Sequence, residues 1–113
     1  MLNQIILVGR LTRDIAVTKL ENGGNVATIP LAIPRSFKNV DGVYDTDFVD
    51  CVAFDTVALN TSEYCNKGDI VGIKGRLQTR NIEDSDKTIP KLEIIAEKIT
   101  FLSSRPKEEP ERN

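Results

Sequence analysis

The most regular alternation of apolar and polar positions in the sequence runs over residues 67–82. Read with the two-residue period of a strand, this segment separates into an apolar side and a polar side. The apolar side consists of Val71, Ile73, Gly75 and Leu77. The polar side consists of Lys74, Arg76, Gln78 and Arg80. Its three cations span about 20 Å at a rise of roughly 3.3 Å per residue, a spacing suited to following a phosphate backbone.

The same period predicts four more strands, at residues 4–11, 25–35, 47–54 and 89–102. Gly9 lies in the first of them and indicates a bend or a close backbone contact. Pro30 and Pro34 lie in the second and indicate a bulge or a free edge, because proline cannot donate to a strand ladder. In the strand predicted at residues 89–102, the alternation of apolar positions shifts by one residue near Glu97 or Lys98, which predicts a β-bulge.

Residues 55–66 are the one helix candidate. Asp55 or Thr56 can cap its start, and Gly68 lies where a left-handed residue is wanted after its end. The chain then reads as three strands, one helix and two strands. This order predicts an all-β fold, a five-stranded OB-fold barrel with one short helix between strands 3 and 4.

The remaining segments are predicted as turns, loops and a tail. Residues 21–24 are a hairpin turn signal, residues 36–46 a long loop, and residues 83–88 a polar hairpin loop. Residues 1–103 are therefore expected to form one domain. Residues 104–113 are charged and contain proline, so they are expected to be a disordered tail that is too polar to pack.

Composition narrows the function classes. The chain has 113 residues, of which 40% are hydrophobic and 28% charged. No apolar run is long enough to cross a membrane and the N-terminus lacks a signal-peptide pattern, which favours a soluble, cytoplasmic protein with no membrane partner. The net charge of −2 and the pI of about 5.2 argue against indiscriminate nucleic-acid binding. Any such function must depend on local arrangement.

Catalytic and metal chemistry find little support in the sequence. The chain has no histidine, which removes the commonest general base, and its two cysteines are too few for a zinc site. Cys51 and Cys65 are interpreted as buried thiols. We expect no catalytic residue, no metal and no cofactor. The rival hypothesis is a metal-dependent barrel nuclease built on the carboxylates Asp45, Asp47 and Asp50.

Aromatic and cationic residues supply the candidate binding site. The core side of the strand at residues 47–54 is small and apolar, which leaves two phenyl rings on its other side. Cations along a groove and rings under successive bases bind single strands without sequence preference, and each stacked base contributes roughly 1–3 kcal/mol. The predicted site residues are Phe37, Phe48, Phe54, Arg10, Arg35, Lys38, Lys74, Arg76 and Arg80. The alternative is that Phe48 and Phe54 belong to a core or an oligomer interface and that the cations form a solvated face.

Several blocks of the sequence resemble the bacterial single-stranded DNA-binding proteins. The resemblance covers about residues 1–102 and rests on Asn3–Asp14, on Asp47–Phe54, on Tyr64 with Lys67-Gly68, and on Gly75–Arg80. It implies an OB-fold, usually a homotetramer, that wraps single-stranded DNA without catalysis or cofactor. Carried over by position, Phe37, Phe48 and Phe54 match aromatic positions that stack on bases. Arg35, Lys38, Lys74, Arg76 and Arg80 lie among or beside the phosphate-contacting surface.

Three departures from the family pattern stand out. Ile82 replaces an aromatic residue of the fourth strand, which predicts weaker affinity. Ile15 replaces a proline, and Pro30 and Pro34 replace ladder-competent residues, so strand two is expected to depart locally from the family barrel. The chain ends without the long linker and acidic tip that recruit replication and repair proteins, which puts such recruitment in doubt and fits an accessory or element-borne paralogue or a trimmed form.

These observations favour one function and leave a second open. The first is sequence-independent binding and protection of single-stranded DNA in replication, recombination or repair. The second is a primosome-type OB-fold module that binds a partner protein and holds DNA only weakly.

Overall fold

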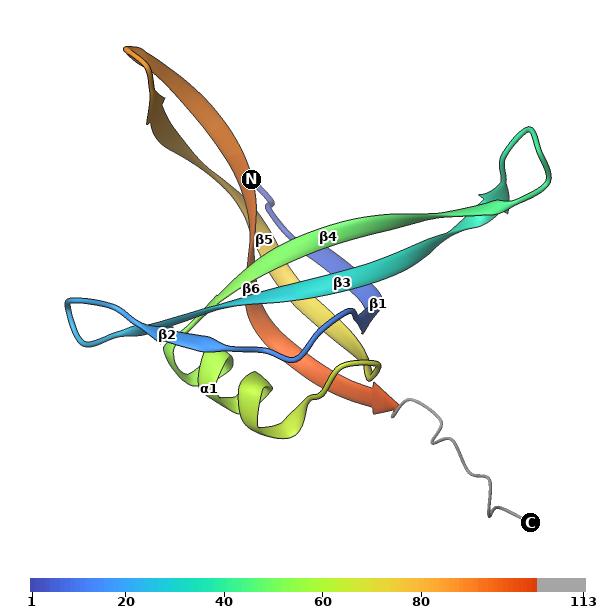
Figure 1. Cartoon of the computed structure of the whole chain (residues 1–113), viewed down its shortest axis with the longest axis horizontal. Helices are drawn as coiled ribbons and strands as arrows, with labels where there is room; N and C mark the ends of the chain where they lie inside the picture. Colours follow the sequence, from blue (N-terminus) through green and yellow to red (C-terminus); the bar gives the residue numbers. More distant parts are fainter. Residues whose placement is uncertain (104–113) are drawn as a thin grey trace.

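The computed structural model describes residues 1–103, in which six strands and one helix follow one another (Figure 1). The tail predicted at residues 104–113 lies outside the described residues. The elements are β1 (Ile5–Leu11), β2 (Val17–Lys19), β3 (Asn25–Lys38), β4 (Tyr44–Phe54), α1 (Asp55–Tyr64), β5 (Ile70–Asp84) and β6 (Lys87–Ser103).

The strands form one sheet that closes on itself. Their order is β1-β5-β6-β4-β3-β2, and a further antiparallel pairing of β1 with β3, at Arg10 opposite Ala32 and Leu11 opposite Leu31, closes the barrel. One contact in the barrel is parallel, between β4 and β6. The predicted five-stranded barrel is confirmed. The helix follows the fourth strand rather than the third, because the three residues of β2 also pair with β3.

The barrel core comes from the sides that the two-residue period assigned to it. Cys51 and Ala53 on β4 and Val71 on β5 are 0% exposed, and Ile73 is 1% exposed. Helix α1 packs Ala58 and Thr61 against one end of the barrel. Both cysteines are free and buried, as predicted. Burial raises the pKa of the Cys51 thiol to about 11, and Asp50 nearby acts in the same direction.

Two glycines permit close packing between strands. A Cβ atom on Gly9 would lie 2.9 Å from a side-chain carbon of Ile33, so the predicted close contact of the first strand is confirmed. A Cβ atom on Gly75 would overlap the backbone carbonyl of Ile95 in β6. The β-bulge expected near Glu97 is also confirmed, since Lys74 pairs with Lys98 while Gly75 pairs with Ala96. Glu97 is the extra residue.

Both prolines lie in β3 without breaking its pairing with β4, which keeps its register as far as Pro34. The carbonyl of Pro30 accepts a hydrogen bond of 3.1 Å from the backbone N–H of Thr12. The polar backbone edge of Pro30 therefore faces the connection between β1 and β2, where no strand pairs with it, and the missing N–H costs no ladder bond. A register shift follows between Pro34 and Lys38. Of the two predicted alternatives, the bulge is confirmed, and it lies just after Pro34. The expected departure of this strand from the family barrel stays a prediction.

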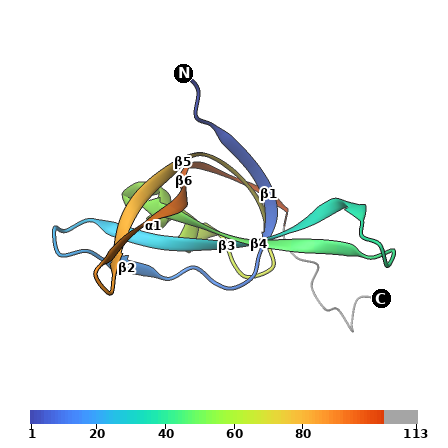
Figure 2. The same ribbon diagram turned by 90° about the horizontal axis from the view of Figure 1, so that it is seen from above.

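The β3–β4 and β5–β6 hairpins extend beyond the barrel (Figures 1 and 2). We call them the β3–β4 arm (residues 35–47) and the β5–β6 arm (residues 78–93). The long loop predicted at residues 36–46 is wrong, because strand pairing continues to Lys38 opposite Tyr44 and leaves a short turn organised by Asn39. The loop predicted at residues 83–88 shrinks to Ser85 and Asp86, whose φ angles of 47° and 69° fit a two-residue hairpin turn.

The helix ends differ from the prediction. The residue at the N-cap is Phe54, and no side chain caps the first turn. The carboxylate of Asp55 instead accepts a hydrogen bond of 3.0 Å from the backbone N–H of Asn25. The helix ends at Tyr64, and Gly68, with φ of 94°, lies in the turn that follows. Within residues 1–103 no helix is long and apolar enough to cross a membrane.

Candidate nucleic-acid interface

The outer face of β4 carries exposed aromatic rings. Phe48 is 75% exposed and Phe54 is 42% exposed, while the residues between them alternate into the core. Their cross-strand partners on β3 are Ala32 and Val26, which are too small to cover a phenyl ring. The alternative that placed these two phenylalanines in the core is wrong. Two flat apolar surfaces are thus available to a ligand with planar groups.

A groove runs beside these rings, between the β3–β4 sheet and the β5–β6 arm. Its volume is about 290 Å³. The sheet contributes Thr28, Asp50 and Val52, and the arm contributes Arg80, Lys91, Leu92 and Glu93. Arg80 and Lys91 are cross-strand partners, so the arm holds two cations above the outer face of β4. The groove therefore adjoins the aromatic face and has cations along one wall.

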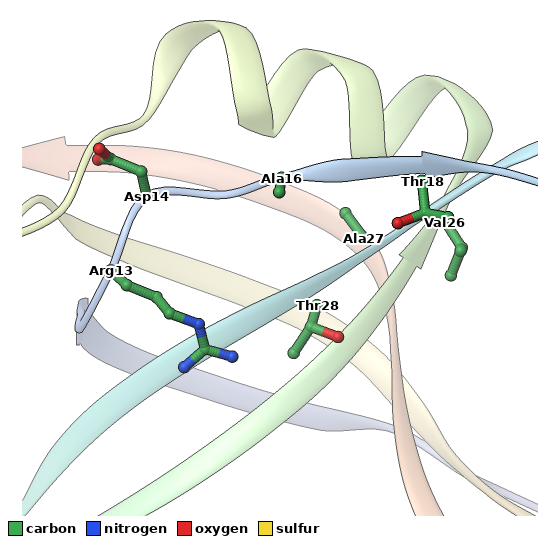
Figure 3. A pocket seen from close by; sticks show the side chains of 7 residues that line it. All are labelled: Arg13, Asp14, Ala16, Thr18, Val26, Ala27 and Thr28. Atoms are coloured by element: carbon green, nitrogen blue, oxygen red, sulfur yellow. The ribbon is translucent and has the colours of Figure 1, made fainter.

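A second hollow, of about 250 Å³, lies along the edge of β3 that faces β2 rather than β4. It is bounded by the connection between β1 and β2 and by the outer residues of β3 (Figure 3). The guanidinium group of Arg13 extends across β3 toward Thr28 (Figure 3). Thr28 lines both hollows, so Arg13 and Arg80 flank the same strip of sheet from opposite sides.

Most of the arginines of the predicted binding site already pair with a carboxylate of the same chain. The guanidinium of Arg35 lies 2.9 Å from a carboxylate oxygen of Asp47 and 3.7 Å from one of Asp45. The hydrogen bond from Arg35 lowers the pKa of the Asp47 carboxyl, and the same bond raises the pKa of Arg35. One arginine thus neutralises two of the three carboxylates that suggested a metal site. Among residues 1–103 no group of three or more metal-ligating side chains is found.

The three cations predicted along one side of β5 are only partly available to a ligand. Arg76 pairs with Glu97 at 3.2 Å and Arg80 with Glu93 at 2.7 Å, both across the pairing to β6. Lys74 has no ion pair within residues 1–103, and it lies beside Ile6 of β1, away from the aromatic face. The alternation predicted for this strand is confirmed from Val71 to Gly75, whereas Leu77, also predicted on the apolar side, is 38% exposed. The three cations do not form one continuous free row.

The remaining predicted site residues lie on the β3–β4 arm or at the turn before β5. Phe37 is 63% exposed on the β3–β4 arm, where Lys38 also lies. Arg10 donates a hydrogen bond of 2.7 Å to the carbonyl of Gly68, so it braces the turn before β5. Ile82 pairs with Ile89 near the end of the β5–β6 arm, where the resemblance implied an aromatic residue.

Sequence reasoning missed Arg13, Lys91 and Tyr44. Arg13 and Lys91 become candidates only because the fold brings the β1–β2 connection and the first part of β6 to the same strip of β3 and β4. Tyr44 could have been found from the sequence, because it lies an even number of residues before Phe48 and Phe54 and so on the same side of an extended strand. The prediction of a loop over residues 36–46 concealed it.

A closed five-stranded barrel with exposed rings and a cationic groove on one strand face defines a class, the OB-fold proteins whose outer face suits single-stranded nucleic acid. Sequence comparison gives the family. The model of the Single-strand binding protein family matches residues 2–102, and the chain belongs to this family.

Individual relatives agree with this membership. The chain is 40% identical over 109 residues to Single-stranded DNA-binding protein B of Bacillus subtilis (strain 168), with 96% of each chain covered. It is 44% identical over 106 residues to a single-stranded DNA-binding protein of Bacillus cereus, covering 93% of this chain and 62% of that one. A crystal structure of a deletion mutant of the single-stranded DNA binding protein from Thermus aquaticus matches with a TM-score of 0.76 at 25% identity, over 92% of this chain and 52% of that one.

Proposed function

We propose that the protein binds and protects single-stranded DNA without sequence preference, in replication, recombination or repair. The observation that carries the proposal is the exposed aromatic face of β4 beside the groove that holds Arg80 and Lys91. Bases stack on Phe48 and Phe54, which discriminate little between bases because every base has a π-face. Phosphates lie along the cations at the edges of this face. The action is binding alone, without catalysis or a cofactor.

The charge distribution sets how strongly salt opposes binding. Arg13, Lys38 and Lys91 adjoin the face and have no ion pair within residues 1–103. Three phosphate contacts give a log–log salt slope of about −2 for single strands, at about 0.7 per contact. Raising the salt from 50 to 200 mM then weakens binding about 20-fold.

The test is a titration of the full chain with a fluorescently labelled dT oligomer at these two salt concentrations. The expected result is saturable binding at low salt, a comparable affinity for a mixed-sequence single strand, and the loss calculated above at higher salt. Absence of saturable binding at low salt would overturn the proposal.

A second function, a module that binds a partner protein and holds DNA weakly, has one observation in its favour. Arg35, Arg76 and Arg80 are neutralised by carboxylates of the same chain, which reduces the attraction of this surface for phosphates. The same titration separates the two functions. Binding only at millimolar oligomer concentration would favour the protein partner.

We further propose that the chain assembles as a homotetramer. β1 pairs with β5 along most of its length but meets β3 only at Arg10 and Leu11, so the rest of its second edge is open. Ile6 is 67% exposed and Val8 51% exposed on the same strand. An open edge with apolar side chains suits pairing with another copy. Light scattering of the purified chain tests this, and a monomer at micromolar concentration would contradict it.

We also propose a cytoplasmic location. The two cysteines are free thiols, which is the usual state in a reducing compartment.

A further inference from the structure

A third aromatic residue shares the outer face of β4. Tyr44 is the first residue of this strand, four positions before Phe48 and ten before Phe54. The strand runs without interruption from Tyr44 to Phe54, and the irregularity in its pairing is a bulge on the β3 side, where Arg35, Ser36 and Phe37 together oppose Asp45. The even spacing therefore places the three rings on one side of the sheet. We call Tyr44, Phe48 and Phe54 the aromatic row.

The aromatic row is exposed along its whole length. Tyr44 is 55% exposed, compared with 75% for Phe48 and 42% for Phe54. At about 3.3 Å per residue, Tyr44 lies about 13 Å beyond Phe48 toward the tip of the β3–β4 arm. A ring that served only to stabilise the hairpin would be expected to lie against its neighbours. Over half of the surface of Tyr44 is instead left to solvent.

A cation accompanies the ring. Lys38 is the cross-strand partner of Tyr44, and its Nζ atom lies 5.7 Å from the centroid of the tyrosine ring. This is within the distance at which a cation and an aromatic face attract each other. Lys38 has no ion pair within residues 1–103, unlike Arg35 on the same arm, whose charge is satisfied by Asp45 and Asp47. The arm thus presents one ring with one uncompensated positive charge over one of its faces.

We propose that Tyr44 and Lys38 form an additional nucleotide-binding subsite on the β3–β4 arm, in which a base stacks on the tyrosine ring and its phosphate pairs with the lysine ammonium. The inference rests on the proposed function, since the occupant is the same single strand that lies on Phe48 and Phe54. It extends the path of that strand beyond the barrel and along the arm. Stacking and a phosphate contact at adjacent positions are the two components by which single strands are held without base readout.

The composition of the chain permits a direct test. It contains no tryptophan and two tyrosines, Tyr44 and Tyr64. Tyr64 lies at the end of α1, beside a hollow lined by Ile99 and Phe101, so it belongs to a different surface. The variant Tyr64→Phe leaves Tyr44 as the one tyrosine emitter. The matched variant Tyr44→Phe leaves Tyr64.

Each variant is titrated with a dT oligomer while tyrosine emission is recorded, and absorption by the oligomer is corrected with a free tyrosine derivative. Anisotropy of a labelled oligomer measures binding independently. We expect emission of the Tyr64→Phe variant to be quenched in step with binding and emission of the Tyr44→Phe variant to stay nearly constant. Binding without quenching of Tyr44 would overturn this inference and leave the proposed function intact. Absence of binding to the unaltered chain would overturn both.

Affinities supply a second readout. Tyr44→Ala is expected to weaken dT binding about 5- to 100-fold, as for loss of one stacked base, while Tyr44→Phe stays within about twofold because it keeps the ring. Val43→Ala, at an exposed neighbouring position on the same arm, is the control and is expected to bind normally. Equal affinity of the Ala variant and the unaltered chain would contradict the proposal.

Discussion

Neutralising the Glu93 carboxylate, which pairs with Arg80, should strengthen DNA binding and steepen its dependence on salt concentration. Glu93 lies in the groove, 2.7 Å from the Nε atom of Arg80, and its side chain is 11% exposed. Glu93→Gln keeps the shape of the side chain and an acceptor oxygen but removes its charge. Arg80 is then free to neutralise a phosphate beside Lys91. The Arg80 side chain is 55% exposed, so loss of this ion pair lowers the free energy of unfolding by about 1 kcal/mol or less.

One additional phosphate contact has a calculable effect. It steepens the log–log salt slope by about 0.7, so binding by the variant weakens about 2.6-fold more than binding by the unaltered chain between 50 and 200 mM salt. Anisotropy titrations with a labelled dT oligomer at four or more salt concentrations measure both slopes. The variant should also bind more tightly at the lowest salt concentration.

The control is Glu63→Gln, which makes the same charge change on the exposed surface of α1. It alters the net charge of the chain but adds no contact, so its slope should match that of the unaltered chain. Identical slopes for the two variants would show that Arg80 does not meet a phosphate. The assignment of the groove as part of the binding path would then be wrong.

Three other predictions concern stacking, pH and packing. Phe54→Ala and Phe37→Ala should each weaken dT binding about 5- to 100-fold without altering the circular dichroism spectrum, because both rings are exposed; unchanged affinity in both variants would remove the stacking claim. Between pH 9 and 11 the free energy of unfolding should fall by on the order of 2 kcal/mol, because the unfolded chain ionises Cys51 while burial keeps the folded thiol protonated with its pKa raised to about 11; Cys51→Ala should flatten this dependence in urea titrations. Gly75→Ala should lower the free energy of unfolding by about 1–3 kcal/mol, because its Cβ would overlap the carbonyl of Ile95; Gly72→Ala, whose Cβ would lie 3.6 Å from a side-chain carbon of Leu102, should cost less in the same urea titrations.

The sequence predicts the barrel well where one side of a strand is buried. The two-residue period of β4 assigned Cys51 and Ala53 to the core and Phe48 to the surface, because burial acts on each residue separately and leaves a local pattern. The bulge at Glu97 was visible for the same reason, since an extra residue shifts the apolar phase. β2 was missed because three residues are too few to display a period.

The arrangement of charges could not be predicted in the same way. Whether Arg80 is free or paired depends on which residue of β6 lies opposite it, and strand register is a property of the whole sheet. Arg13 reaches the binding face from the β1–β2 connection and Lys91 from the start of β6, and neither placement leaves a local pattern in the sequence. The arm that carries Tyr44 was predicted as a loop because Asp41 and Gly42 are turn-forming residues, yet the turn is short and the strands continue on both sides.

The central claim is that the single strand lies on the outer face of β4, and amide chemical-shift mapping tests it most directly. A ¹⁵N-labelled chain is titrated with a dT oligomer, and shift changes are assigned to residues. The largest changes are expected along Tyr44–Phe54 and at Arg80 and Lys91, with α1 little affected. Changes concentrated on α1 or along the open edge of β1, with β4 unchanged, would contradict it.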